Sequence, residues 1–393
     1  MSKYLASFGA VPIDFVKGEG AYLFDRKGKK YLDFLGGWCV STVGWKNPEM
    51  AAALARQAKE GLYVPPIFSS GRQEELARRL IELAPGKLRR VFRSTSGSEA
   101  VEYGLMCVRA ATGKPTVVSI DGVYHGHTYG AAALGDACIP KMGPCPEGFL
   151  KLPLPKTAEE GRAVVAEFER LVTERGDVAA FMSEPFWTNA GCHLPPVGFY
   201  EGIQRVCRRH GVLLAMDEVA TGMGRSGRLF ASELWGLTPD VICLGKSFTG
   251  GYASMGATLV TESVFRKSRG IPDYCTFGWL PQDLAAAEQN LDLIISRKLA
   301  ANAADVGAFL LAELKPLEKL AKVKQVRGQG LVFGIEFRLP IAPLIAVACY
   351  RRGLITAFTD VRTLFFSPPL VLDRHLAKKG AVIIEAACGI KPS

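Results

Sequence analysis

The sequence lacks long apolar segments. No run of about 18 or more apolar residues occurs in its 393 residues, so nothing in it predicts a membrane span. The opening MSKYLASFGAVPIDF has no continuous apolar stretch of the kind that a signal peptide requires. Low-complexity tracts are also absent, and the charged fraction of 22% argues against disorder. These absences predict a folded chain without a membrane partner.

Paired cysteine motifs are missing as well. Ten cysteines are scattered along the chain without a single CxxC pair, which predicts reduced, mostly buried thiols in a cytoplasmic protein and no disulfide framework. The formal net charge is +10, but Lys and Arg are interleaved with Glu on helix-like segments such as residues 72–79. We interpret the basic excess as solvated helix faces and assign no nucleic-acid partner.

Short apolar, β-branched runs alternate with helical patterns through the middle of the chain. The helical pattern of residues 198–210, for example, is followed by Gly211 as a helix cap. Nearly continuous apolar strands predict a sheet covered on both faces, and strand–helix alternation predicts an α/β fold with a mainly parallel sheet. Functional residues should gather at the carboxyl ends of its strands. The predicted strands are Thr116–Ile120, Val178–Ser183, Val212–Met216, Asp240–Leu244 and Gly256–Val260.

The two flanks of the chain read differently from its middle. Residues 20–34 predict a hairpin, and residues 323–337 predict strand, turn and strand. These flanks predict a smaller α+β domain built from both chain ends: residues 1–49 and 284–393, around a large domain of residues 50–283. The helices predicted in the second flank cover about 284–298, 301–319, 341–352 and 374–388.

Two loops carry candidate binding groups. Residues 92–102, FRSTSGSEAVE, place small residues at a helix N-terminus, where backbone N–H groups and the helix dipole favour a phosphate; an ordinary helix cap is the alternative. Residues 121–128, DGVYHGHT, follow a predicted strand, and Tyr124 or His125 would stack on a planar cofactor. A metal site at His125 and His127 is the alternative, but no ligand partner at suitable spacing supports it.

Two charged residues end predicted buried strands. Asp217 needs a partner because an unpaired buried charge is costly, and a protonated pyridine nitrogen would be one. Lys246 lies among Gly and Ser in a partly desolvated position, where a lysine amine becomes a nucleophile. Taken singly, a lysine at a strand end is more often a surface residue.

The order of these segments identifies a family. SGSEA, YHGHT, DEV and a lysine 29 residues after Asp217 resemble the class III pyridoxal-5′-phosphate (PLP) aminotransferases of fold type I. The likeness runs from about residue 10 to the C-terminus. It includes the opening GEGAYLFDRKGKKYLDFLGG, Glu184-Pro185, residues 221–227 and 276–278, RGQGL at 327–331 and SPPL at 367–370.

The resemblance implies specific roles. Lys246 would hold PLP as a Schiff base and move the substrate proton, and Asp217 would pair with the pyridinium nitrogen. Thr276 would reach the phosphate of a neighbouring subunit, which implies a homodimer with its site at the subunit interface. The other residues implied to contact the cofactor are Ser96, Gly97 and Ser98 at the phosphate, Tyr124 and Val219 on the two ring faces, and His125 and Glu184.

Three departures from the family pattern bear on the substrate. Members acting on ornithine, acetylornithine or 4-aminobutyrate pair a Glu with a substrate-binding Arg, where this chain has Asn189 and Phe365. Ala220 replaces the usual Gln that bonds the phenolic oxygen of the ring. These features resemble the amine:pyruvate (ω-transaminase) branch, in which a mobile Arg admits the keto-acid carboxylate; Arg362 is our candidate. The aromatic candidates for the donor pocket, each with plain core as the alternative, are Trp38, Trp45, Tyr63 and Trp187.

We therefore expect a ping-pong transfer of an amino group from a primary amine or ω-amino compound to a 2-keto acid, with pyruvate favoured. An aminomutase similar to glutamate-1-semialdehyde aminomutase, which shares the Asn189 pattern, or a decarboxylase is the alternative on the same scaffold. A non-catalytic binding protein with this fold and a metal hydrolase using His125 and His127 are the remaining alternatives.

Overall fold

A seven-stranded sheet forms the centre of the protein, for which we obtained a computed structural model that describes residues 11, 13–65, 67–68, 70–137 and 143–389. Its strand order is β4-β10-β9-β8-β7-β5-β6. All neighbouring strands are parallel except that β10 runs antiparallel to both β4 and β9. The mainly parallel sheet predicted from the sequence is confirmed. The strands are β4 Leu88–Ser94, β5 Thr116–Ile120, β6 Phe149–Leu152, β7 Val178–Ser183, β8 Leu213–Asp217, β9 Val241–Leu244 and β10 Gly256–Thr261.

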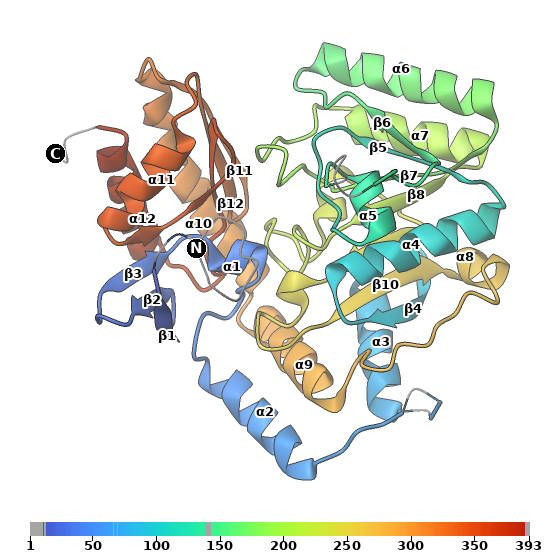
Figure 1. Ribbon diagram of the computed structural model, residues 1–393, viewed down its shortest axis with the longest axis horizontal. Helices are drawn as coiled ribbons and strands as arrows, with labels where there is room; N and C mark the ends of the chain where they lie inside the picture. The colour runs from blue at the N-terminus through green and yellow to red at the C-terminus, as the bar shows by residue number, and fades with distance from the viewer. Residues whose placement is uncertain (1–10, 12, 66, 69, 138–142, 390–393) are drawn as a thin grey trace.

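Helices cover both faces of this sheet. Figure 1 shows α6 (Ala158–Arg175) and α7 (Phe199–His210) on one side, and α4 (Gly97–Thr112) with α8 (Glu262–Lys267) on the other. Every residue of β5 and β7 is buried, as expected of strands that are apolar along their whole length. Helix α7 ends at Gly211, whose φ of 66° favours glycine at a C-terminal cap.

Both ends of the chain build a smaller part of the molecule. The antiparallel sheet β11-β12-β15-β14 carries α10, α11 and α12, while β1, β2 and β3 share a second sheet with β13, which pairs in parallel with β3. Figure 1 shows both small sheets at the left, beside the central sheet. The strands are β1 Phe15–Glu19, β2 Tyr22–Asp25, β3 Lys30–Asp33, β11 Val323–Gln329, β12 Val332–Phe337, β13 Leu354–Ile355, β14 Ala357–Asp360 and β15 Thr363–Phe366.

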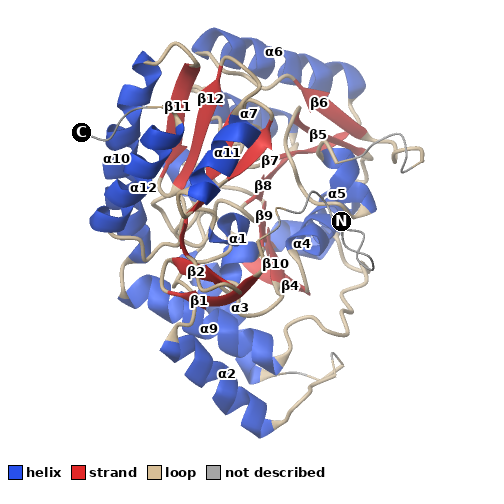
Figure 2. Ribbon diagram, turned by 60° about the vertical axis from the view of Figure 1, so that its left-hand side comes forward, coloured by secondary structure: helices blue, strands red, loops and turns tan. Residues whose placement is uncertain are grey.

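The remaining helices connect these parts. Helix α2 packs against α9 at the lower edge of the molecule (Figure 2), and α3 precedes β4. The largest hydrophobic core runs through the central sheet into α9, α10 and α12 without interruption. The helices are α1 Gly36–Cys39, α2 Pro48–Glu60, α3 Gly71–Leu83, α5 Tyr129–Leu134, α9 Pro281–Ser296, α10 Leu299–Leu314, α11 Ala342–Arg351 and α12 Arg374–Ala387.

Arg225 joins three distant segments from a fully buried position. Its Nη2 donates to the Ser41 carbonyl at 2.6 Å, and its Nη1 donates to the Pro368 carbonyl at 2.8 Å. Gly36 lies beside the same segment, and a Cβ on it would meet the Ser367 carbonyl oxygen at 2.4 Å. Glycine is therefore required there, and the N-terminal and C-terminal segments approach closely under the loop that carries Arg225.

The cysteines and the helix lengths bear on two sequence predictions. Eight cysteines of the described residues are free and buried, as expected. Cys145 is disulfide-bonded, so the prediction of reduced thiols was wrong for this residue. No CxxC or similar spacing in the sequence indicates this disulfide. In the described part of the chain, no helix is both long and apolar enough to cross a membrane.

Candidate active site

A cavity of about 210 Å³ opens where the carboxyl ends of β5, β7, β8 and β9 meet the N-terminus of α4. Parallel strands bring their following loops to one edge, so residues far apart in sequence converge there. The cavity contains nine of the ten residues that the resemblance assigned to the cofactor, all except Thr276. It is lined by Ser96, Gly97, Ser98, Tyr124, His125, Gly126, His127, Glu184, Asp217, Val219, Ala220 and Lys246.

Asp217, the last residue of β8, is buried and held on both carboxyl oxygens. His125 Nδ1 lies 2.6 Å from its Oδ2, and the backbone N–H of Val219 donates to its Oδ1 at 2.9 Å. The other ring nitrogen of His125 lies 3.2 Å from Ser119 Oγ. Both ring nitrogens of His125 therefore have polar partners, Asp217 and Ser119, and the His125 side chain orients the Asp217 carboxylate. The stacking role predicted for Tyr124 or His125 did not include this contact, which joins two loops far apart in the sequence.

The two histidines of the metal alternative contact different side chains. His127 Nδ1 lies 3.0 Å from Tyr124 Oη, so the two histidines have different partners. Across the described residues, His, Cys, Asp and Glu side chains nowhere form a group of three or more that could hold a metal ion. We therefore base no metal chemistry on them.

Lys246 directly follows a tight approach of two backbones. A Cβ on Gly245 would meet the Gly97 Cα at 2.9 Å, so glycine is needed for the loop after β9 to lie against the start of α4. Lys246 itself has a φ of 40°, in the left-handed region that non-glycine residues adopt at a cost. Asn290 fixes the following turn by donating to the Ser247 and Phe248 carbonyls. The lysine is therefore positioned by strained but well-supported backbone.

The N-terminus of α4 forms a cradle for an anion. Ser96 is the N-cap, and its Oγ accepts from the Glu99 N–H at 3.2 Å. A Cβ on Gly97 would lie 2.5 Å from Val219 Cγ1, so the space over the first turn exists only because residue 97 is glycine. Free N–H groups and the dipole of a 16-residue helix favour a phosphate there.

Glu184 follows β7 and is 1% exposed. Its Oε1 accepts a hydrogen bond from the Thr188 hydroxyl, whereas its Oε2 is buried without a partner among the described residues. Burial, and then the charge of Asp217, raise the pKa of this carboxyl to about 8. A buried polar atom without a protein partner is a place where an ordered water, an ion or a bound ligand is expected.

Together these groups fit PLP. The cavity offers an amine for its aldehyde, a carboxylate for its ring nitrogen, an anion cradle for its phosphate, and Tyr124 and Val219 for the ring faces. Each of these anchors differs in chemistry from the others, so the set fits PLP better than a simpler anion.

The aromatic candidates for the donor pocket lie outside this cavity. Trp38 stacks on the fully buried Phe365, with ring centroids 5.3 Å apart and planes at 23°, and its Nε1 donates to Asn189 Oδ1 at 3.2 Å. Trp187 is fully buried and donates to Ser183 Oγ, so it is a core residue and we withdraw it from the pocket. Its indole is apolar enough to suit either location, which is why the sequence did not distinguish them.

The other two aromatic candidates serve structural contacts in this chain. Trp45 Nε1 donates to Asp33 Oδ2 at 2.8 Å, beside the Arg225 segment. Tyr63 is exposed, and its hydroxyl donates to the Thr276 carbonyl at 3.1 Å. Thr276 is exposed too and is not among the residues that line the cavity of its own chain.

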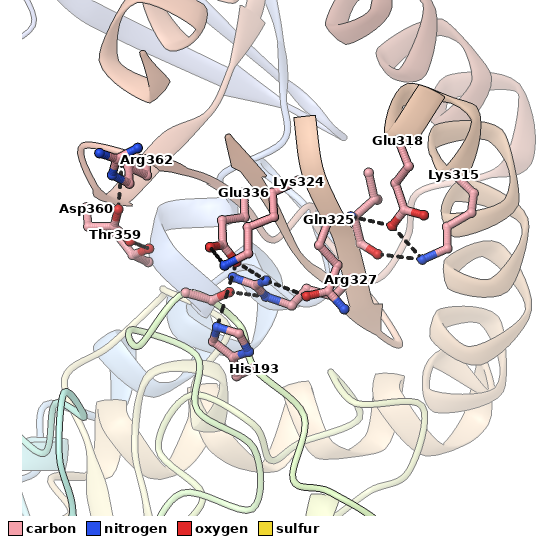
Figure 3. A network of polar contacts seen from close by, with 12 residues as sticks. His193, Lys315, Glu318, Lys324, Gln325, Arg327, Glu336, Thr359, Asp360 and Arg362 are labelled. Atoms are coloured by element: carbon pink, nitrogen blue, oxygen red, sulfur yellow. Dashed lines mark hydrogen bonds and ion pairs between the residues drawn. The ribbon is translucent and has the colours of Figure 1, made fainter. Parts of the chain in front are cut away.

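A second cavity of about 500 Å³ contains Arg362 and Asn189. In Figure 3, Arg327 is central to its polar network: its Nη1 pairs with Glu336 at 2.6 Å, and its Nε donates to the Gly191 carbonyl at 2.7 Å. Arg362 lies beside Asp360 and donates to the Arg338 carbonyl. The Arg362 side chain therefore lines this second cavity and not the one that contains Lys246. The ion pair between Arg327 and Glu336 was not predicted from the sequence.

Comparisons with known proteins agree with this geometry. The aminotransferase class-III family model matches residues 5–388. The acetylornithine aminotransferase of Bacillus subtilis is 34% identical over 95% of this chain and 94% of its own length. The putrescine aminotransferase of Pectobacterium atrosepticum is also 34% identical, over 90% and 77%.

Solved structures match over nearly the whole length. An amine transaminase from an uncultivated Pseudomonas species, in its PLP-bound (internal aldimine) form, has a TM-score of 0.93 and 30% identity over 98% of both chains. The ω-transaminase of Pseudomonas jessenii in complex with PMP has a TM-score of 0.91 and 27% identity, over 96% of this chain and 92% of that one. This chain therefore belongs to the class-III aminotransferases, which are PLP-dependent enzymes.

Proposed function

We propose that this aminotransferase moves an amino group from a primary amine or ω-amino compound to a 2-keto acid, with pyruvate preferred over 2-oxoglutarate. The supporting observation is the contact of Trp38 with Phe365 and Asn189. Two stacked aromatic rings and an amide occupy the place where the resemblance puts an Arg–Glu pair. None of these three side chains carries a positive charge for a second substrate carboxylate, so they favour keto acids with one carboxylate.

The residues of the cavity have separate tasks in this proposal. When bound, PLP accepts into its protonated ring the electrons released at the substrate carbon. Asp217, oriented by His125 and the Val219 N–H, pairs with the ring nitrogen. Lys246 would hold the aldehyde carbon through Nζ and, as a free amine during turnover, would carry the proton to and from the substrate carbon.

Other residues hold and shield the cofactor. Ser96, Gly97 and Ser98 bind the phosphate at the start of α4. Tyr124 and Val219 confine the two ring faces. An amine is released as its carbonyl product before the keto acid enters, which predicts ping-pong kinetics.

We also propose a homodimer in which Thr276 completes the phosphate site of the other subunit. Its exposed position, outside the lining of its own cavity, supports this role. The two segments that meet where Tyr63 contacts Thr276 expose apolar side chains that a second copy would cover; they are Leu62, Tyr63, Ile67, Phe68, Tyr274 and Phe277. Equal molecular weights for the chain and the particle in light scattering would exclude the dimer.

Two smaller proposals concern organisation. The pairing of β3 with β13 supports a domain made of residues 1–49 and 284–393 around a large domain of residues 50–283. The eight free, buried cysteines support a cytoplasmic location, and the disulfide of Cys145 is the observation that weighs against it.

The test of the substrate proposal is a panel of amine donors assayed with pyruvate and 2-oxoglutarate in parallel. We expect pyruvate to give the higher kcat/KM. The double variant Asn189→Glu with Phe365→Arg should shift the preference toward 2-oxoglutarate, and Phe365→Leu is its control for lost aromatic packing. A clear preference of the unmodified enzyme for 2-oxoglutarate would contradict the proposal.

An aminomutase is the second candidate, because Asn189 also matches that pattern. A mutase releases one isomerised product and needs no keto-acid acceptor. Parallel lines in double-reciprocal plots, with two separately released products, would exclude it.

A further inference from the structure

The phenolic oxygen of PLP has no donor in the set described above. Lys246, Asp217 and the start of α4 account for the aldehyde, the ring nitrogen and the phosphate. In the family pattern a Gln bonds the phenolic oxygen, and this chain has Ala220 at that position. Ala220 is 3% exposed and presents only a methyl group to the cavity. An oxygen beside the carbon that reacts would thus lie against an apolar wall unless another residue reaches it.

Glu184 is the side chain of the cavity lining that keeps a buried oxygen without a partner among the described residues. It follows β7, which lies between β5, with its Tyr124 loop, and β8, which ends in Asp217. Its backbone carbonyl accepts from the Tyr200 hydroxyl, and its Oε1 accepts from the Thr188 hydroxyl. Only Oε2 is left without a partner among the described residues.

The surroundings of Glu184 favour its neutral form. Full burial penalises a negative charge on its carboxyl group, and Asp217 on β8 repels that charge further. The hydrogen bond from Thr188 and the charge of Lys246, after β9, oppose these effects only in part. Tyr200 on α7 and His125 on the Tyr124 loop are the other titratable groups nearby, and their hydrogen bonds go to the Glu184 carbonyl and to Asp217. With the Thr188 hydroxyl on Oε1, the carboxyl proton belongs on Oε2.

We propose that neutral Glu184 donates a hydrogen bond from Oε2 to the phenolic oxygen of bound PLP, in place of the side chain that Ala220 lacks. This inference rests on the proposed roles of Lys246 and Asp217. Glu184 then has a positioning and electrostatic role at the cofactor. A hydrogen-bond donor stabilises the ionised phenolic oxygen and so lowers the pKa at which the chromophore loses its proton.

The first test requires no turnover and no cofactor. Infrared spectra of the apoprotein near pH 6 should contain the carbonyl band of a buried neutral carboxyl group, and Glu184→Gln should remove it. Glu99→Gln serves as the control, because the Glu99 carboxylate already accepts from Thr95. Absence of a band that depends on Glu184 would overturn the proposal.

The second test follows the visible absorbance of the resting holoenzyme as a function of pH, without substrate. Glu184→Leu should raise the midpoint of the chromophore titration by about one pH unit, the effect of one hydrogen bond to a charged oxygen. Glu184→Gln, which keeps an N–H donor, should stay near the wild-type midpoint. Adding Ala220→Gln to Glu184→Leu should bring the midpoint back.

An unchanged midpoint in Glu184→Leu would overturn the proposal, as would equal shifts in the Leu and Gln variants. If Glu184→Leu does not fold, Glu184→Gln and the infrared band still decide the question. A wild-type enzyme that turned over no amine would instead refute the proposed function and leave the infrared result unaffected.

Discussion

Replacing Arg225 with methionine tests the joint between the N-terminal, central and C-terminal segments. The guanidinium donates to the carbonyls of Ser41 at 2.6 Å and Pro368 at 2.8 Å, and more weakly to Ser367 and Leu331 at 3.3 and 3.4 Å. Methionine has a similar length but no donor, so these buried carbonyls would lose their partner.

The size of the effect follows from the two short contacts. Leaving a buried acceptor unpaired costs about 1–3 kcal/mol, so two of them predict a loss of about 3 kcal/mol once relief from burying the charge is allowed for. Unfolding entropy of about 2.1 cal/mol/K per residue gives about 0.8 kcal/mol per kelvin for a chain of 393 residues. Arg225→Met should therefore lower the Tm by about 4 °C, and Arg225→Lys, which keeps one donor group, by about half as much.

Differential scanning fluorimetry of the apoprotein measures this shift. The matched control is Arg78→Met, because Arg78 is exposed and pairs only with Glu75 and Glu82 on its own helix surface. Exposed pairs contribute little, so the control should stay within about 1 °C of wild type. If Arg225→Met also stayed within that range, the reasoning that these carbonyls depend on the buried guanidinium would be refuted.

Three further outcomes are expected. Asp217→Asn keeps the shape of the side chain but removes its charge, and it should lower kcat by about 100-fold or more while PLP still binds; a loss below tenfold would contradict the ring-nitrogen role. Gly97→Ala places a Cβ 2.5 Å from Val219 Cγ1 and should weaken PLP binding in equilibrium dialysis, with partial recovery in the double variant Gly97→Ala with Val219→Ala; equal affinity of Gly97→Ala and wild type would refute the cradle. Because the folded-state pKa of Glu184 is raised from 4.5 to about 8, its stabilising effect is complete below about pH 4.5 and is lost as the pH rises to about 8, by up to about 1.4 kcal/mol per pH unit. Apoprotein Tm values across that window should fall less in Glu184→Gln, and parallel curves would contradict the raised pKa.

The sequence predicted well those elements that local pattern determines. The predicted strands 116–120 and 178–183 coincide with β5 and β7, because an uninterrupted apolar run reports burial on both faces. Strand β4 was missed: its LRRVFRS sequence carries three arginines and is only partly buried, so charge concealed the strand. The antiparallel direction of β10 is equally invisible to periodicity, since direction depends on the connection and not on the residues.

The candidate site divides in a similar way. Lys246, Asp217 and Gly97 stand in short segments whose order identifies the family, so they were predictable. The contact of His125 with Asp217 joins residues 92 positions apart in the sequence, so local pattern could not predict it. That Glu184 Oε2 has no partner among the described residues is likewise visible only once the strands are packed together. Trp187 shows the opposite error, because an aromatic residue near a site suits a core as well as a pocket wall.

Borohydride reduction of the purified protein saturated with PLP tests the central assignment most directly. Lys246 shares its cavity with the buried carboxylate of Asp217, the partner expected for the ring nitrogen. We predict a yellow protein that bleaches on reduction and a pyridoxyl label on the peptide that contains Lys246, with none in Lys246→Ala. A colourless protein, or a stable label on any other lysine, would contradict the account.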